Sequence, residues 1–238
     1  MKNKKPLILA IIPARGGSKS IPRKNIKNLA GKPLIVYTIE TALKSDFLDR
    51  VIVSTDDEEI AEVARKYGAE VVVRPKKLAE DETPTLPVLQ HVVKYLEEKE
   101  NYKVDVVVVL QPTSPLREVS DIDNSIKKVL DTNADSVETF CQVNYLPSCM
   151  FKIIGDKAIP LDRKSLEKYK GRQDFPELYK ENGAVFVVRR NVLMRKNTVY
   201  GVDHRAVIMP KERSIDIDDI IDFKLAELII NEKNKNWR

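Results

Sequence analysis

The sequence predicts a three-layer α/β protein, in which a parallel sheet lies between two layers of helices. Two observations support this prediction. Apolar runs of strand length alternate with amphipathic helical patterns over residues 7–110, and these runs are continuous rather than interrupted by polar residues. Continuous Val and Ile runs are typical of parallel strands buried on both faces of the sheet. At 238 residues the chain is long enough for one large domain, or for one domain with a sizeable insertion.

We expect the elements in the following order. Strands at residues 7–12, 50–54, 70–73 and 105–110 are separated by helices at residues 33–44, 58–67 and 85–98. A helix at residues 121–131, strands at residues 136–143 and 183–190, and a closing helix at residues 219–231 follow. Residues 144–180 break the alternation. We interpret them as an insertion, formed by a hairpin and a polar excursion, within a single domain of residues 1–238.

The composition describes a globular protein that favours anionic partners. Hydrophobic residues make up 42% of the chain and the formal net charge is +5, which suits a nucleotide or a nucleic acid. Basic residues are spread among nearly as many acids, so nucleic acid is the weaker interpretation. No apolar run is long enough to cross a bilayer and no signal peptide is predicted. The two cysteines lack CxxC spacing, which indicates free thiols, and we therefore expect a cytoplasmic protein that binds no membrane.

A basic loop with two adjacent glycines follows the first predicted strand. Its sequence, "IPARGGSKSIPRKN" at residues 12–25, contains four Arg or Lys residues and no acid. Glycines let backbone N–H groups turn towards an anion, and the cations supply charge. The candidate anion-binding residues are Gly16, Gly17, Arg15, Lys19 and Lys24. The loop matches neither common phosphate-loop pattern, so the residues alone leave a phosphate cradle and a solvated surface loop equally open.

Two further polar segments follow predicted strands, where open α/β sheets bind their ligands. In "VSTDDEE" at residues 53–59, we expect Asp56 or Asp57 to cap the next helix. In "LQPTSPLR" at residues 110–117, two prolines restrict the loop, and the neutral hydrogen-bonding side chains are Gln111, Thr113 and Ser114. Neutral groups suit a sugar or a base, although a rigid turn without a ligand is the alternative.

The segment "SIDIDD" at residues 214–219 is a candidate metal site. If it is a strand, Asp216 and Asp218 point to one face, and the two isoleucines between and before them point to the other. Two carboxylates held close together repel each other unless a cation lies between them. Hard oxygen ligands at this spacing suit Mg²⁺, particularly when phosphates complete the coordination shell. A polar strand end without a metal is the alternative.

Together these segments resemble the acylneuraminate cytidylyltransferases, also called CMP-sialic acid synthetases. The similarity is carried by "IPARGGSKSIPRKN", "VSTDD", "LQPTSPLR", "ENGAVFV" and "SIDIDD", in this order and spacing, and it extends over residues 11–223. It implies a nucleotide-diphosphosugar-transferase-like (Rossmann-like) fold with a mixed, mostly parallel sheet, and it implies a homodimer. It also implies transfer of CMP from CTP to the anomeric hydroxyl of a nine-carbon 2-keto acid sugar, with release of pyrophosphate.

The resemblance further implies roles for single residues. The CTP-binding set is Arg15, Gly16, Gly17, Ser18, Lys19, Lys24, Asn25 and Arg74, and the sugar-binding set is Gln111, Thr113, Ser114 and Lys180. Asp216 and Asp218 are the implied Mg²⁺ ligands, and with Arg15 and Lys24 they form the implied catalytic set. Residues 144–180 are the implied dimerisation excursion, which reaches the partner's site. The only two histidines lie outside these motifs, so we expect no histidine base.

Two departures from the family pattern bear on the substrate. Ser20 stands where the family commonly has glycine, and Lys180 stands where many bacterial members place an arginine that binds the sugar carboxylate across the dimer. Lysine keeps the charge but loses the bidentate geometry. The sequence therefore leaves open which acid is used: N-acetylneuraminic, legionaminic, pseudaminic or another. A cytidylyltransferase for an eight-carbon sugar, a metal-dependent glycosyltransferase and a non-catalytic nucleotide sensor are the alternatives.

Overall fold

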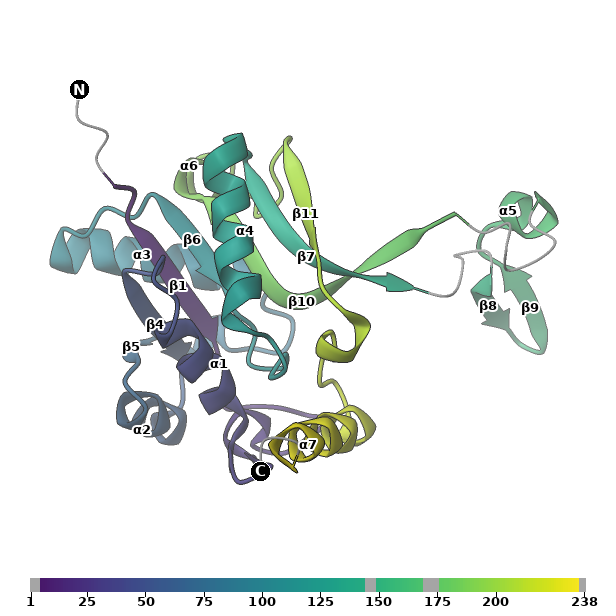
Figure 1. The fold of residues 1–238 in the computed structure, drawn as a ribbon, viewed down its shortest axis with the longest axis horizontal. Coiled ribbons are helices and arrows are strands. Elements are labelled where there is room, and N and C mark those ends of the chain that lie inside the picture. Colours follow the sequence, from purple (N-terminus) through teal and green to yellow (C-terminus); the bar gives the residue numbers. More distant parts are fainter. Residues whose placement is uncertain (1–4, 144–148, 169–175, 236–238) are drawn as a thin grey trace.

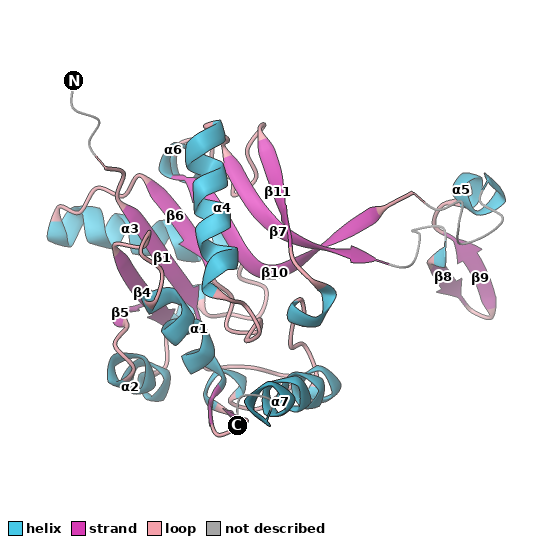
Figure 2. Cartoon of the chain, viewed as in Figure 1, coloured by secondary structure: helices cyan, strands magenta, loops and turns pink. Residues whose placement is uncertain are grey.

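A seven-stranded sheet is the centre of the molecule, and the computed structural model describes residues 5–143, 149–168 and 176–235 (Figures 1 and 2). The strand order is β11-β7-β10-β6-β1-β4-β5. The strands are β1 (Ile8–Pro13), β4 (Arg50–Thr55), β5 (Glu70–Val73), β6 (Val106–Val109), β7 (Ser136–Val143), β10 (Leu178–Arg189) and β11 (His204–Ile208). Every neighbouring pair is parallel except those of β10, which runs antiparallel to both β6 and β7. The expected mixed, mostly parallel sheet is confirmed.

Helices cover both faces of this sheet, which makes the three layers. They are α1 (Leu34–Leu43), α2 (Glu58–Lys66), α3 (Thr85–Glu100), α4 (Val119–Thr132) and α6 (Arg190–Met194), whereas α7 (Ile220–Lys235) packs in a separate apolar cluster with the start of α1. Strand β1 has apolar side chains on both faces. Ile8, Ala10 and Ile12 pack in one core cluster with α1, α2 and α4, whereas Leu9 and Ile11 pack in a second cluster with α3 and α6. Continuous apolar strands are therefore needed, as the sequence indicated.

The predicted elements up to residue 143 are found within about two residues of their expected ends. Two predictions need correction. The strand expected to begin at residue 183 begins at Leu178, and residues 214–219, expected as a strand, form an irregular segment. That segment is fixed by its surroundings instead: the Ile217 N–H donates to the Thr113 carbonyl oxygen at 2.8 Å, and the Ile217 side chain is buried in the cluster that seats α7. Within the described ranges, no helix has the length and apolar character needed to cross a membrane.

The insertion projects from one end of the sheet (Figure 1). Beyond the body of the sheet, β7 and β10 continue as a pair through the register Leu178↔Val143. At their far end lie the antiparallel hairpin of β8 (Phe151–Ile154) and β9 (Lys157–Pro160) and the short helix α5 (Arg163–Lys168). The hairpin expected in residues 144–180 is thus present; residues 144–148 and 169–175 of the predicted excursion lie outside the described residues. We call residues 149–168 the arm.

Candidate active site

The loops that follow β1, β4 and β6 meet at one edge of the sheet. These three strands are parallel neighbours, so their carboxyl ends lie together. The basic loop follows β1, Asp56 and Asp57 follow β4, and the "LQPTSPLR" loop follows β6. The hydrogen bond between Ile217 and Thr113 adds the acidic segment to the same edge. All the motifs singled out in the sequence therefore converge on one place.

The basic loop is held in shape by polar contacts of its own. The Asn25 side-chain amide donates to the Arg15 carbonyl oxygen at 3.0 Å, and the Gly16 N–H donates to Asp56 at 3.1 Å. Asp57 caps α2 by accepting from the Ile60 N–H, as one of the two predicted acids was expected to do. The Gly16 amide is therefore engaged within the protein, and Asn25 is buried and positions the loop.

Gly16 is required because Asp57 lies against it. A Cβ at Gly16 would lie 2.6 Å from Asp57 Oδ2, whereas a Cβ at Gly17 would meet no atom within 4 Å. Asp57 is itself fixed by Arg23, whose guanidinium makes a two-point contact with the carboxylate. That hydrogen bond from Arg23 lowers the pKa of Asp57 below its ordinary value. Arg23 thus belongs to the scaffold of the loop and is not one of its free cations.

Asp81 draws two predicted phosphate-binding cations together. It lies in the loop that precedes α3, and its carboxylate pairs with Arg15 Nη1 at 2.7 Å and also with Lys19 Nζ. The contact with Lys19 lowers the pKa of Asp81, with Arg15 adding to the effect. Since both cations converge on one carboxylate, an oxyanion of a ligand has the same two partners available.

Arg74 is a buried arginine with unused hydrogen-bonding capacity. Only 5% of its surface is exposed, and its Nε has no hydrogen-bond partner. Burial lowers the pKa of Arg74, and the nearest carboxylate, Asp56, lies 4.0 Å away. Arg74, Arg15 and Gln111 line one cavity of about 240 Å³. An unpaired buried donor is costly, so this cavity suits a ligand that offers acceptors.

The "LQPTSPLR" loop is fixed by its own arginine. Arg117 is buried and donates to the carbonyl oxygens of Ala184 at 2.5 Å and Gln111 at 2.7 Å, and to Thr38 Oγ1 at 3.1 Å. Burial lowers the pKa of Arg117 to about 9. Ser114 is also fully buried, with its hydroxyl 3.4 Å from the Asn182 carbonyl oxygen. Ser114 therefore shares the scaffold role of Arg117 and does not face the cavity, whereas Gln111 does.

Asp216 and Asp218 lie close together at the edge of the same region. Burial raises the pKa of Asp216, a hydrogen bond from Thr113 opposes this, and the charge of Asp218 adds to it. Lys24 lies close enough to favour the ionised form, and its Nζ donates to the Ile217 carbonyl oxygen at 2.7 Å. Asp216 Oδ1 is buried without a hydrogen-bond partner. The correction of the strand thus leaves the predicted pairing of these two acids in place.

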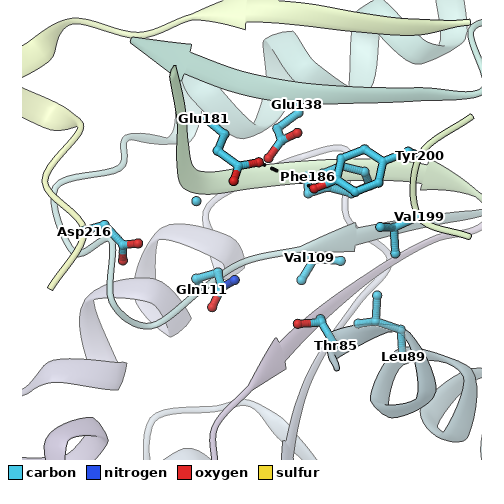
Figure 3. Close-up of a pocket in the computed structure, with 11 residues that line it drawn as sticks. Thr85, Leu89, Val109, Gln111, Glu138, Glu181, Phe186, Val199, Tyr200 and Asp216 are labelled. Atoms are coloured by element: carbon cyan, nitrogen blue, oxygen red, sulfur yellow. Dashed lines mark hydrogen bonds between the residues drawn. The ribbon is translucent and has the colours of Figure 1, made fainter. Parts of the chain in front are cut away.

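A central cavity of about 300 Å³ joins these parts (Figure 3). Gln111 lines both this cavity and that of Arg74, and Asp216 lines both this cavity and a third one. Lys180 and Asp218 line that third cavity together with Asp216. Arg15 and Arg74, then Gln111, then the two aspartates therefore lie along three neighbouring cavities that share lining residues, and we call these three cavities together the cleft.

Sequence reasoning missed a second acidic pair in the central cavity. Glu138 and Glu181 lie side by side on its wall, across from Gln111, with Phe186 and Tyr200 next to them (Figure 3). The one available signal was a glutamate inside the apolar run "SVETF" of β7, which is buried in the structure. Glu181 begins the quoted segment "ENGAVFV", but the sequence did not indicate its place, because it reaches this wall only through a bulge in β10 between residues 181 and 186.

Comparison with known proteins identifies relatives over nearly the whole chain. The sequence model of the cytidylyltransferase family matches residues 9–235. An N-acylneuraminate cytidylyltransferase of Escherichia coli is 34% identical over 96% of this chain and 53% of its own length. A pseudaminic acid cytidylyltransferase of Campylobacter jejuni is 34% identical over 93% of this chain and 95% of its own length. The chain spans about half the length of the first of these relatives.

The fold is shared with a solved structure of more distant sequence. A CMP:2-keto-3-deoxy-manno-octonic acid synthetase, solved in complex with CTP, superposes with a TM-score of 0.72 at 17% identity. The match covers 95% of this chain and 99% of that one. The expected nucleotidyltransferase fold is therefore confirmed.

Proposed function

The chain belongs to the cytidylyltransferase family, and we propose that it transfers CMP from CTP to the anomeric hydroxyl of a nine-carbon 2-keto acid sugar, releasing pyrophosphate. One observation carries this proposal. The three cavities of the cleft present cations at one end, a neutral amide in the middle and a pair of carboxylates at the other end. This order suits a nucleoside triphosphate that meets a polyhydroxylated acid beside a metal site.

The basic end of the cleft is the proposed CTP site. Arg15 and Lys19 already converge on one carboxylate, and buried Arg74 has an unpartnered Nε. Displacing Asp81 by a phosphate leaves both surface cations paired. Gly17 and Ser18 lie in the loop between these cations and offer backbone N–H groups. Gly16 and Asn25 support the site indirectly, by letting Asp57 and Arg15 take their observed places.

Asp216 and Asp218 are the proposed ligands of a Mg²⁺ ion. The residues present fit such an ion, because Asp216 Oδ1 is buried without a partner and the charge of Asp218 destabilises ionised Asp216. A cation removes both penalties. In the described part of the chain no group of three or more His, Cys, Asp or Glu side chains is placed to hold a metal, so phosphates, the sugar and water complete the shell in our proposal. A bound Mg²⁺ supplies Lewis-acid polarisation of the α-phosphate.

Other side chains of the cleft bind the sugar and stabilise the charge of the departing pyrophosphate. Gln111 orients the sugar by hydrogen bonds, and Lys180 offers a positive charge to the sugar carboxylate beside the two aspartates. The bond from the anomeric oxygen to the α-phosphorus forms while the bond to pyrophosphate breaks, and the anomeric hydroxyl releases its proton to solvent. Arg15 and Lys24 offset the charge that develops on pyrophosphate. Holding both reactants in line accounts for a further part of the rate.

We propose that the acceptor has nine carbons, because relatives about one third identical are named for such acids. The likeness to the synthetase for an eight-carbon acid concerns the fold alone at 17% identity. We also propose a cytoplasmic location. CTP is available there, and the described cysteines, Cys141 and Cys149, are both free.

We further propose that the chain forms a homodimer through the arm. Ile153 and Leu161 are 68% and 60% exposed, and Phe151 and Ile154 are also exposed. A small hairpin that shows this much apolar surface is rarely stable by itself in water. A second copy of the chain would cover it. Lys180 lines a cavity of its own chain, so it does not depend on the partner for access to the aspartates.

The proposed function is tested by measuring pyrophosphate release from CTP with N-acetylneuraminic, legionaminic, pseudaminic and eight-carbon 2-keto acids. We expect release that needs both Mg²⁺ and one of the nine-carbon acids, with the CMP-sugar identified by mass spectrometry. Release without any acceptor would indicate hydrolysis. Failure with every sugar would favour a nucleotide sensor, and a preference for the eight-carbon acid would overturn the assigned sugar class.

A further inference from the structure

The wall of the central cavity opposite Gln111 consists of two glutamates. Glu138 comes from β7 and Glu181 from β10, and both side chains point towards the open space (Figure 3). Glu138 is 6% exposed, whereas Glu181 is exposed at the mouth. The remaining wall is largely apolar and includes Leu89 and Val199. Acids of this kind are rarely placed in an apolar wall without a purpose, because their burial costs free energy.

A bulge in strand β10 brings the two glutamates together. In the register of β10 with β7, Glu181 is opposite Phe140 and Phe186 is opposite Glu138. Between these pairs, four residues of β10 (182–185) therefore lie opposite one residue of β7 (Thr139), and Gly183 takes the extra turn with φ of 65°. A bulge of this kind redirects side chains that a regular strand would hold apart.

The carboxyl group of Glu138 lies next to the ring of His204. His204 Nε2 lies 3.4 Å from Glu138 Oε2, and His204 Nδ1 lies 2.8 Å from Ser136 Oγ. The Gly201 N–H donates to the same Ser136 oxygen at 3.0 Å. His204 therefore has a fixed place between Ser136 and Glu138. Burial also lowers the pKa of His204, which keeps the ring neutral.

The part of the chain that the structure describes offers this glutamate pair no strong cationic partner. Among the described residues, no Lys or Arg forms an ion pair with either glutamate. Burial raises the pKa of Glu138 to about 8, and the charge of Glu181 adds to this shift. Two carboxyl groups in contact share one proton at neutral pH. Glu138, whose pKa is the raised one, therefore holds the proton and contacts Glu181, and Glu181 Oε2 also lies 3.5 Å from Tyr200 Oη.

We propose that Glu181, held in place by Glu138, determines which sugars are accepted by receiving a hydrogen bond from an O–H or N–H donor on the sugar. This inference rests on the proposed function, which places the sugar in the central cavity. Asp216 lines the same cavity, and Glu181 also lines the cavity of Asp218, so the donor belongs to the part of the sugar that faces Glu181 beside the proposed metal site. A sugar without a donor at that position leaves a desolvated carboxylate unpaired and is rejected. A hydroxyl or an amide nitrogen next to a methyl group fits best, because Leu89 and Val199 offer apolar contact nearby.

The decisive variant is Glu181→Gln, compared with Glu177→Gln as the matched control. Glu177 is an exposed acid near the start of the same strand, bonded to Tyr179 and outside the cavity. In Glu181→Gln we expect the KM for the preferred sugar to rise at least about tenfold, because a charged acceptor is lost, while the KM for CTP changes less than about twofold. Glu177→Gln should match the parent for both substrates. Equal melting temperatures establish that both variants are folded.

A second variant tests the shared proton. Glu138→Gln keeps a permanent donor towards Glu181, so the KM for the sugar should no longer depend on pH between 7 and about 9, whereas in the parent it should rise as Glu138 ionises near pH 8. Glu181, His204 and Tyr200 are the other titratable groups facing Glu138, and all three remain.

Separate measurements of sugar binding and of turnover distinguish the proposed function from the proposed specificity role of Glu181. Calorimetric titration of N-acetylneuraminic and N,N'-diacetyllegionaminic acids into the parent protein measures binding independently of catalysis. If neither sugar is turned over but one binds, and Glu181→Gln weakens that binding, the proposed function fails while the specificity role stands. If the parent forms a CMP-sugar and Glu181→Gln leaves the KM for the sugar unchanged, the proposed function stands and this inference is wrong. Absence of sugar binding to the parent also overturns it.

Discussion

Burial of Asp216 disfavours the ionised carboxylate that the proposed metal site needs. One of its carboxylate oxygens is buried and unpartnered, and its neighbour Asp218 carries the same charge. Such an arrangement lowers stability when no cation is present, and this is why we propose a cation there. Glu138 shows a related conflict, which is relieved by protonation instead of by a metal. The cost of burying the charge is thus offset differently in the two acids: by protonation in Glu138 and, in our proposal, by a bound cation in Asp216.

Asp216→Asn separates charge from shape at the proposed metal site. The variant keeps the size of the side chain, so its melting temperature should equal or exceed that of the parent. We expect kcat/KM to fall at least about a hundredfold, since a metal ligand is lost, and the Mg²⁺ concentration for half-maximal activity to rise. Asp203→Asn, at an exposed acid paired with Arg205, is the control and should be active. Parent-like activity and Mg²⁺ dependence in Asp216→Asn would mean that the metal lies elsewhere.

Glu138 makes stability depend on pH. Its pKa is raised from 4.5 to about 8, so the folded state binds the proton more tightly than the unfolded state. This contribution is complete below pH 4.5 and is lost as the pH rises to about 8. Each pKa unit corresponds to about 1.4 kcal/mol of unfolding free energy. We expect the melting temperature of the parent to fall more between pH 6.5 and 9 than that of Glu138→Gln. His204 titrates below this interval, so parallel curves would refute the shift.

At the scale of elements, the sequence was informative wherever local pattern decides structure. The alternation of apolar runs and helices located β1, β4, β5, β6 and β7. Strand β1 shows the reason, because its side chains enter core clusters on both faces of the sheet. Residues 214–219 were misassigned because period-two polarity resembles a strand, while the actual cause of the pattern is one buried isoleucine and one hydrogen bond to Thr113. The Glu181 side of the cleft depends on a bulge, and pairing register between distant strands leaves no local signal.

The basic loop offers a direct test of how its two glycines differ. Gly16→Ala places a Cβ 2.6 Å from Asp57 Oδ2, so Asp57 must move and weaken its contacts with Arg23 and the start of α2. We expect a loss of about 1–3 kcal/mol of unfolding free energy, as is usual for overpacking. Gly17→Ala meets no atom within 4 Å and should melt like the parent. Equal melting temperatures for the two variants would show that Asp57 does not impose the glycine.

At the scale of the whole molecule, the body and the arm differ in how they bury apolar residues. Both faces of the sheet are covered within one chain, and the core side chains are nearly inaccessible. The arm lies beyond the ends of β7 and β10 and exposes its apolar side chains (Figure 1). Because β10 also carries Lys180 and Glu181, a partner that holds the arm would steady the strand that lines the cleft. Dimerisation and sugar binding are therefore expected to be linked.

This linkage can be tested with one charge on the arm. Ile153→Glu places a carboxylate at a position that is 68% exposed in the single chain, so it should not unfold the body. In a dimer the same charge would be buried without a partner, which costs several kcal/mol and favours the monomer. Light scattering should give a dimer for the parent and a monomer of about 27 kDa for the variant.

Lys152→Glu, a charge change at the neighbouring exposed residue, is the control and should remain dimeric. We expect the monomer to bind CTP normally but to show a raised KM for the sugar. A variant that stays dimeric, or a parent that is monomeric at all accessible concentrations, would remove the arm as the interface.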